Sequence, residues 1–268
     1  MRVGRHSALA GQFLILFALY LNFARFPKFP FFIWLATLLI ALLVNFYLFA
    51  IVGFLMLAHS LDSFQRNLKI QWPKLIGFWA IAAVLVVMSA YMLGYFSGSP
   101  VDPGQGGYGF FRMHVLALFD PQGWSKLLPS MLTSQEKFGP DQLSNGVVEG
   151  HYYLGAGLML MLAIELAYFR KIQLDGARQF INDHKFLLSI LILLSCFSIT
   201  NNITIGNLNL YLPIPGWLND IFSILRSAGR LFLPSFYVII LGILLIFCKI
   251  FSAKFAIGLM SLALIVQI

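Results

Sequence analysis

The sequence predicts an all-α fold, a polytopic bundle of about seven transmembrane helices with one long outward-facing loop. Hydrophobic residues make up 60% of the 268 residues, charged residues only 10%, and the mean hydropathy is +0.85. These values are typical of a chain whose solvent is lipid. Long apolar runs recur along the chain, with basic residues at their ends. We therefore expect one integral membrane domain over residues 1–268.

A transmembrane helix needs about 20 apolar residues to cross about 30 Å of hydrocarbon. The apolar stretch after Met1–His6 is longer than the core of a signal peptide and lacks a small-residue cleavage site, so we expect a retained span. The last run stops at Ile268 without a charged flank, which predicts that the chain is a fragment of a longer protein. The expected spans are Ala8–Ala24, Phe31–Ala58, Leu75–Phe96, Tyr152–Phe169, Phe186–Thr200, Leu231–Cys248 and Phe255–Ile268.

The run Phe31–Ala58 is too long for one ordinary span. As a single straight helix it would measure about 42 Å. We expect either a strongly tilted helix or a division near Val44 and Asn45, which would give a short membrane-dipping helix followed by a full span. The sequence leaves both alternatives open.

Lys and Arg favour one set of alternate connections, which includes Arg2 and Arg5. The positive-inside rule places this set and the N-terminus in the cytoplasm. The loop Ser97–Gly150 and the segment Asn201–Arg230 then face outward. If Phe31–Ala58 forms two spans, the N-terminus moves to the outer side and both segments stay there.

The charge of +8 and the isoelectric point near 9.6 would suggest nucleic acid as the partner of a soluble protein. Here the placement of the basic residues indicates topology and lipid headgroup contact, so we expect no nucleic-acid partner. Cys196 and Cys248 each lie inside an apolar run, so neither a disulfide framework nor a zinc site is expected.

The loop Ser97–Gly150 is rich in Gly and Pro, a composition that excludes long regular elements. Gly104–Gly109 matches G-x-G-x-x-G, but no strand precedes it, so a flexible turn or a small anion-binding nest remains. The loop also contains many titratable side chains. They could hold a cation or act as an acid/base pair, and the alternative is that they are simply solvated charges. The candidate binding residues in and beside the loop are Arg112, His114, Glu149 and His151.

Residues 217–230 predict a short amphipathic helix at the membrane surface. Arg226 and Arg230 are four residues apart and share a face if the helix continues through Gly229. Paired guanidiniums suit phosphate recognition, and the alternative is contact with ordinary lipid headgroups. The apolar positions of the expected helix are Leu218, Ile221, Phe222 and Leu225.

Three ionisable residues fall in or beside predicted spans. Glu165 lies about one turn from Arg170, which favours snorkelling or ion pairing at the cytoplasmic surface over an intramembrane role. His59 and Asp62 end the second predicted span, where we expect interfacial positions.

Four short motifs together resemble an uncharacterised bacterial family of polytopic membrane proteins that carries a domain of unknown function and is similar to C-type (integral membrane) glycosyltransferases. The segment Arg5–Leu9 and Gln12 also resemble this family. The motifs are Gly106–His114, Leu118–Pro121, Glu149–Gly155 and Leu225–Phe232.

The resemblance implies a bacterial inner-membrane protein that binds a polyprenyl-phosphate-linked sugar at the outer face, with a divalent cation and a carboxylate base in the first outward loop. The connection Arg25–Pro30 contains no Asp or Glu, so no catalytic residue is assigned. The residues carried over as outer-face binding groups are Arg112, Glu149, Arg226 and Arg230. The alternatives are a non-enzymatic transporter or flippase for lipid-linked cargo and a catalytically inactive assembly subunit.

Overall fold

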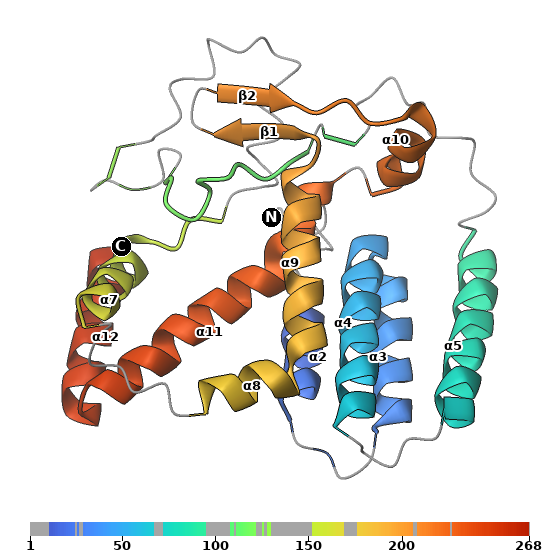
Figure 1. The fold of residues 1–268 in the computed structure, drawn as a ribbon, viewed down its shortest axis with the longest axis horizontal. Helices are drawn as coiled ribbons and strands as arrows, with labels where there is room; N and C mark the ends of the chain where they lie inside the picture. Colours follow the sequence, from blue (N-terminus) through green and yellow to red (C-terminus); the bar gives the residue numbers. More distant parts are fainter. Residues whose placement is uncertain are drawn as a thin grey trace. The chain divides into compact units, whose positions relative to one another are not determined.

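The structure is a computed structural model. It describes residues 11–24, 26, 29–66, 72–94, 108–109, 111–121, 125, 128–129, 152–168, 176–205, 208–225 and 227–267. The described part is mostly helical, as predicted, and it divides into two compact units. Unit 1 comprises Met1–Asp102 with Gly176–Leu193, and unit 2 comprises Pro103–Asp175 with Leu194–Ile268. Each unit is described by itself (Figure 1).

Unit 1 is built from apolar helices. Trp34, Ile51 and Leu55 are among its fully buried side chains, and they come from two consecutive helices. Its helices are α2 (Phe13–Phe23), α3 (Phe31–Val44), α4 (Phe46–Gln65), α5 (Trp72–Met92), α8 (Ala177–Asp183) and the first part of α9 (Lys185–Ile199).

The long apolar run of the sequence is divided at Asn45. This residue has an extended backbone, with φ −169° and ψ 138°, and it separates α3 from α4. Its side-chain oxygen accepts a hydrogen bond of 2.9 Å from the backbone N–H of Tyr47, so Asn45 is the N-cap of α4. Of the two alternatives that the sequence left open, the structure selects the division.

The helices α3 and α4 fold back on each other as an antiparallel pair (Figure 1). A Cβ atom at Gly53 would lie 3.7 Å from Cδ1 of Leu38, and the ring centroids of Trp34 and His59 are 5.4 Å apart. Residues farther before Asn45 on α3 therefore contact residues farther after Asn45 on α4, as expected for an antiparallel pair. Phe29, just before α3, stacks 5.1 Å from His59, so the start of α3 lies beside the end of α4.

Asp62 and His59 are buried within unit 1, and each residue is 1% exposed. The carboxylate oxygens of Asp62 accept hydrogen bonds from the backbone N–H groups of Phe186 (2.9 Å) and Leu187 (3.1 Å). A carboxylate at a helix N-terminus satisfies N–H groups that have no partner within the helix. Asp62 therefore fixes the start of α9 against α4.

Unit 2 has two adjoining hydrophobic clusters. Leu154, Met161, Ile243, Phe247 and Ala256 form the first, which joins α7, α11 and α12. The elements of this unit are the end of α9, α7 (Ala156–Ala167), β1 (Asn202–Ile205), β2 (Leu208–Tyr211), α10 (Gly216–Ser223), the 3-10 helix η5 (Ala228–Phe232), α11 (Leu233–Ile250) and α12 (Ala253–Gln267).

The antiparallel hairpin β1–β2 is a finding that the all-helical prediction lacks (Figure 1). Its register pairs Ile203 with Leu210 and Ile205 with Leu208. The sequence did contain a signal for it. β-branched and polar residues alternate in Asn202–Ile205, and Gly206-Asn207 is a dipeptide typical of two-residue hairpin loops.

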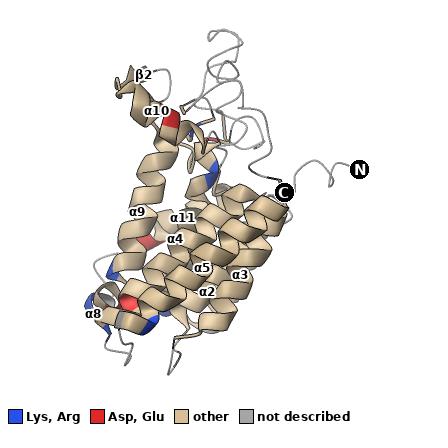
Figure 2. Ribbon diagram, turned by 90° about the vertical axis from the view of Figure 1, so that its right-hand side faces the viewer, with Lys and Arg blue, Asp and Glu red and all other residues tan. Residues whose placement is uncertain are grey.

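Three helices of the described part are long and apolar enough to cross a membrane: Phe46–Gln65, Pro73–Met92 and Ala228–Ile250. They indicate a membrane protein. Four shorter apolar helices accompany them, so the expected number of about seven spans is not confirmed. Figure 2 shows that most of the helical ribbon carries no Lys, Arg, Asp or Glu, and that several of these residues lie around α8.

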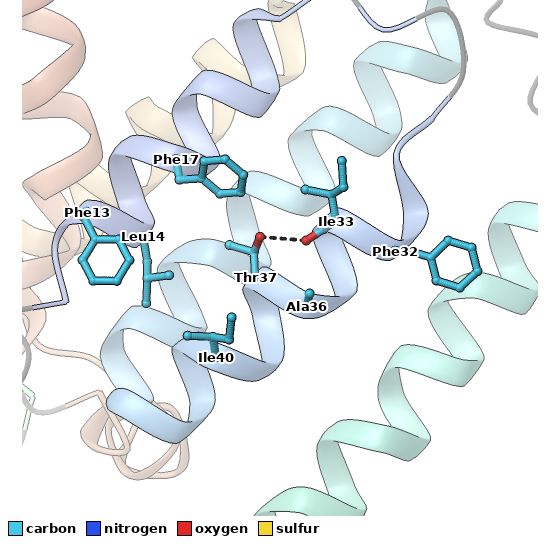
Figure 3. Close-up of a pocket in the computed structure, with 8 residues that line it drawn as sticks. All are labelled: Phe13, Leu14, Phe17, Phe32, Ile33, Ala36, Thr37 and Ile40. Carbon is cyan, nitrogen blue, oxygen red and sulfur yellow. Dashed lines mark hydrogen bonds between the residues drawn. The ribbon is translucent and has the colours of Figure 1, made fainter.

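An open groove runs along α2 and α3, with a volume of about 760 Å³ (Figure 3). Its lining is apolar except for Thr37, whose hydroxyl donates to the carbonyl of Ile33 at 2.7 Å and is thereby satisfied. The groove therefore offers no polar group to a charged ligand.

Replacing Asn45 with Ala should lower the free energy of unfolding by about 0.5–2 kcal/mol, because the N–H of Tyr47 loses its cap. The measurement is equilibrium unfolding in mixed detergent micelles, followed by circular dichroism. Asn45→Ser, which can still cap, is the control and should recover most of the loss. Equal stability of the Ala variant and the wild type would show that the cap does not hold this helix start.

Candidate functional site

The candidate site lies in unit 2, where the predicted outward segments meet. Among the predicted binding residues, the structure describes Arg112, His114 and Arg230. Glu149, His151 and Arg226 lie outside the described residues.

The segment Phe111–Asp120 is anchored by its backbone to two other elements. The N–H of Met113 donates to the carbonyl of Ser198 at 2.8 Å, near the end of α9. The N–H of Val115 donates to the carbonyl of Thr204 in β1 at 3.1 Å. The hairpin and the end of α9 thus position the backbone that carries Arg112 and His114.

Arg112 is the most informative residue of the site because it is a cation with only 4% of its surface exposed. Its Nε donates to the hydroxyl of Thr204 at 2.9 Å, and its Nη1 donates to the carbonyl of Gly109 at 2.9 Å. Both acceptors are neutral. No carboxylate among the described residues forms an ion pair with it. Burial accordingly lowers the pKa of the Arg112 guanidinium from its ordinary value.

Gly229 brings three distant segments together through its backbone. Its N–H donates to the carbonyl of Phe111 at 2.9 Å, and its carbonyl accepts from the hydroxyl of Tyr152 at 2.8 Å. Arg112 and Arg230 are each one residue from the first of these bonds. The structure therefore places the backbone of Arg112 near that of Arg230, although the two residues are far apart in the sequence.

The predicted amphipathic helix of residues 217–230 is shorter than expected. Helix α10 ends at Ser223, and η5 begins at Ala228, so one α-helix does not continue through Gly229 to Arg230. The physical reason is tertiary: the N–H of Gly229 bonds to Phe111 instead of a carbonyl of the preceding turn. Arg230, which is half-buried, directly follows this bond.

Tyr108 and Gly109, which precede the segment Phe111–Asp120, hold its start in place. The ring of Tyr108 packs 4.8 Å from Phe197 and 5.0 Å from Phe222, and its hydroxyl donates to the carbonyl of Phe197 at 3.1 Å. Gly109 has a φ of +97°, and a Cβ there would lie 2.9 Å from Oδ1 of Asn201. Only glycine fits this position without strain.

His114 and Asp120 are buried in the same segment. Nδ1 of His114 accepts a hydrogen bond of 3.1 Å from the N–H of Leu116, so this nitrogen is unprotonated and the neutral ring carries its proton on Nε2. Asp120 ends the segment, and its N–H donates to the carbonyl of Leu116 at 3.0 Å. His114 therefore contributes a neutral ring to the site.

Within the described ranges, no group of three or more His, Cys, Asp and Glu side chains gathers where a metal ion would bind. The divalent cation implied by the resemblance accordingly has no assigned ligands. Glu165 is 4% exposed and does not snorkel to the surface as expected. Its predicted partner, Arg170, lies outside the described residues.

Sequence reasoning missed Thr204, Tyr152 and Gly229, which hold the site together. Thr204 belongs to the hairpin, whose alternating pattern was a usable signal. Tyr152 and Gly229 lie inside the motifs Glu149–Gly155 and Leu225–Phe232, but no pattern in the sequence indicated that the two residues are hydrogen-bonded.

Replacing Gly109 with Ala should destabilise unit 2 by about 1–3 kcal/mol, because the new Cβ meets Asn201 and the backbone conformation is strained for an L residue. Thermal unfolding of the purified protein measures this. Gly216→Ala is the matched control, since nothing lies within 4 Å of a Cβ there, and it should leave the midpoint unchanged. Equal effects of the two variants would contradict the proposed role of Gly109.

Tyr108 should ionise later than an ordinary tyrosine. Burial raises its pKa to about 12 from the ordinary value of 10.0. The folded pKa exceeds the unfolded one, so this phenol contributes stability below pH 10, and the contribution disappears as the pH rises through about 12. The measurement is the difference in phenolate absorbance between the wild type and Tyr108→Phe. A difference that titrates near pH 10 would show that Tyr108 is exposed.

Comparison with known proteins gives one match. A family model described as a domain of unknown function (DUF6311) matches residues 1–268. No curated protein and no solved structure matches the chain. The resemblance to an uncharacterised family is thereby confirmed, whereas its similarity to glycosyltransferases remains a prediction. The chain belongs to the family of domains of unknown function DUF6311.

Proposed function

We propose that the outer segment of unit 2 binds the phosphate headgroup of a polyprenyl-phosphate-linked sugar, and that the protein is glycosyltransferase-like. The observation that carries this proposal is Arg112, a buried cation whose two hydrogen-bond acceptors are neutral. A buried charge is costly unless an opposite charge accompanies it. Since no carboxylate among the described residues supplies that charge, the proposal assigns it to the ligand.

A phosphate suits the donors that Arg112 has left. A guanidinium has five N–H donors, and the structure uses the Nε donor and one on Nη1. The remaining donors match phosphate oxygens in geometry and charge. The proposal assigns the second cation to the half-buried Arg230, because it directly follows Gly229, whose N–H bonds to Phe111 beside Arg112.

The outer location in this proposal rests on the positive-inside rule, which gives the same side for the loop whether Phe31–Ala58 forms one span or two. If both helices pass through the membrane, the N-terminus lies on the outer side with the loop Ser97–Gly150. The connection Arg25–Pro30 then lies on the cytoplasmic side. In this topology Arg25 and Lys28 are cytoplasmic, whereas Arg2 and Arg5 are not. The number of Lys and Arg residues on the cytoplasmic side is therefore the same in both topologies.

The mechanism that we propose for this chain is electrostatic. Arg112 and Arg230 hold the lipid-linked phosphate and stabilise the negative charge that grows on it as the sugar leaves. The Thr204 and Gly109 contacts fix the guanidinium of Arg112 in advance, so its orientation costs little when the charge develops. No residue is assigned as the base that activates the acceptor.

The test is binding of polyprenyl phosphate to the protein in lipid nanodiscs, with the corresponding polyprenol as the uncharged probe. Arg112→Gln should weaken phosphate binding by about 10- to 100-fold, because hydrogen bonds to charged groups contribute about 1.5–3 kcal/mol. Binding of the polyprenol should not change. Sugar transfer is then measured with the same variants and a lipid-linked sugar donor.

Two controls separate charge from folding. Arg178→Gln removes the same charge from an exposed position on α8 and should leave binding unchanged. Thr204→Val removes one hydrogen bond of Arg112 but keeps its charge, so it should weaken binding much less than Arg112→Gln. Equal losses in Thr204→Val and Arg112→Gln, or equal affinity for phosphate and polyprenol, would refute the proposal.

A further inference from the structure

Glu165 occupies a position where an apolar residue is expected. The buried residues of α7 are Gly157, Met161 and Glu165, which are spaced by four and so lie along one face of the helix. Met161 packs with Phe247 and Ala256 in the hydrophobic cluster of α7, α11 and α12. The carboxyl group of Glu165, with 4% of the residue exposed, faces this same interior.

The carboxyl group has a hydrogen bond with the backbone of Phe247 on α11, but its two oxygens are not both satisfied. Its Oε1 atom is buried and has no hydrogen-bond partner among the described residues. Beyond the helix end, the ring of Tyr168 packs 5.6 Å from that of Phe251, which joins the end of α7 to the end of α11. An ionised carboxylate in this position would be a buried charge with an unsatisfied oxygen, which is among the costliest arrangements in a protein.

The neighbouring helices supply no described counter-ion. On α11 the charged residue is Lys249, and on α12 it is Lys254; both are exposed, and neither forms an ion pair with Glu165. The other titratable groups of these elements are Cys248, which is exposed, and the neutral phenols of Tyr168 and Tyr237. Within the described part of the chain, the charge of Glu165 is therefore not compensated by another side chain.

We propose that Glu165 is a proton-binding site within the apolar interior of unit 2, occupied at neutral pH. One carboxylate oxygen forms an O–H bond with a proton from solvent, which neutralises the charge and converts that oxygen from an acceptor into a donor. No bond to carbon changes, and no electron is transferred. This site is separate from the phosphate site at Arg112, and the inference does not depend on the proposed function.

Protonation of Glu165 has a mechanical consequence for the helices around it. The neutral acid is compatible with the close packing of α7 on α11 and α12, whereas the carboxylate draws water or a cation into the cluster. Loss of the proton should therefore loosen this packing, so that proton uptake and release are coupled to the arrangement of the three helices.

The experiment is labelling with dicyclohexylcarbodiimide, an apolar reagent that adds to protonated carboxyl groups to give a stable N-acylurea without a leaving group. At about pH 7 an exposed carboxyl is ionised and reacts poorly. Mass spectrometry of peptides should show labelling at Glu165 at least about tenfold above that at the exposed Asp220. Glu165→Gln should abolish the label, whereas Asp220→Asn should leave it unchanged.

A second measurement tests the coupling to packing. In an unfolded chain a glutamate has lost its proton above about pH 4, so the folded state that keeps it binds more protons and loses stability as the pH rises. The unfolding midpoint of the wild type should fall from neutral to alkaline pH, and Glu165→Gln should reduce this fall.

The opposite results would overturn the inference. They are an unlabelled Glu165 in a folded protein, or labelling of Glu165 by a water-soluble carbodiimide as strong as that of Asp220. The same pH dependence of the midpoint in Glu165→Gln and the wild type would refute the coupling. Arg112→Gln should retain the label, so this result and phosphate binding succeed or fail separately.

Discussion

The fold depends on one constraint: a polar group that is buried away from water must find a partner inside the protein. This constraint fixes helix ends as much as contacts. The side chain of Asn45 caps α4, and the carboxylate of Asp62 satisfies the first N–H groups of α9. Asn45 lies between two helices and Asp62 lies near the end of α4, and each satisfies N–H groups where a helix starts.

The same constraint organises the segment Phe111–Asp120 of unit 2. Both polar groups of the Gly229 backbone are used, one by Phe111 and one by Tyr152, so one residue joins three segments that are distant in sequence. The hydrogen bonds to Thr204 and Gly109 fix Arg112 through neutral acceptors. They do not neutralise its charge, and the proposed phosphate ligand would do so.

Arg112 and Glu165 are buried ionisable groups of unit 2, and no described residue of opposite charge forms an ion pair with either of them. They differ in how that charge can be removed. A guanidinium keeps its proton at any physiological pH, so Arg112 needs an anion. A carboxylate can bind a proton, so Glu165 needs no partner. One group therefore points to a phosphate ligand and the other to a proton, although both lie in the same unit.

The sequence by itself determined the helical membrane class, and it indicated Val44 and Asn45 as the place where the run Phe31–Ala58 could divide. It also held the alternating pattern of the hairpin, which a helical interpretation of the whole chain overlooked. Only the tertiary structure decided between one tilted helix and two helices, because the choice depends on the cap at Asn45 and on the packing of α3 against α4. Only the tertiary structure, too, placed the backbone of Phe111 beside that of Gly229. That hydrogen bond joins backbone groups, which every residue has and no sequence pattern records.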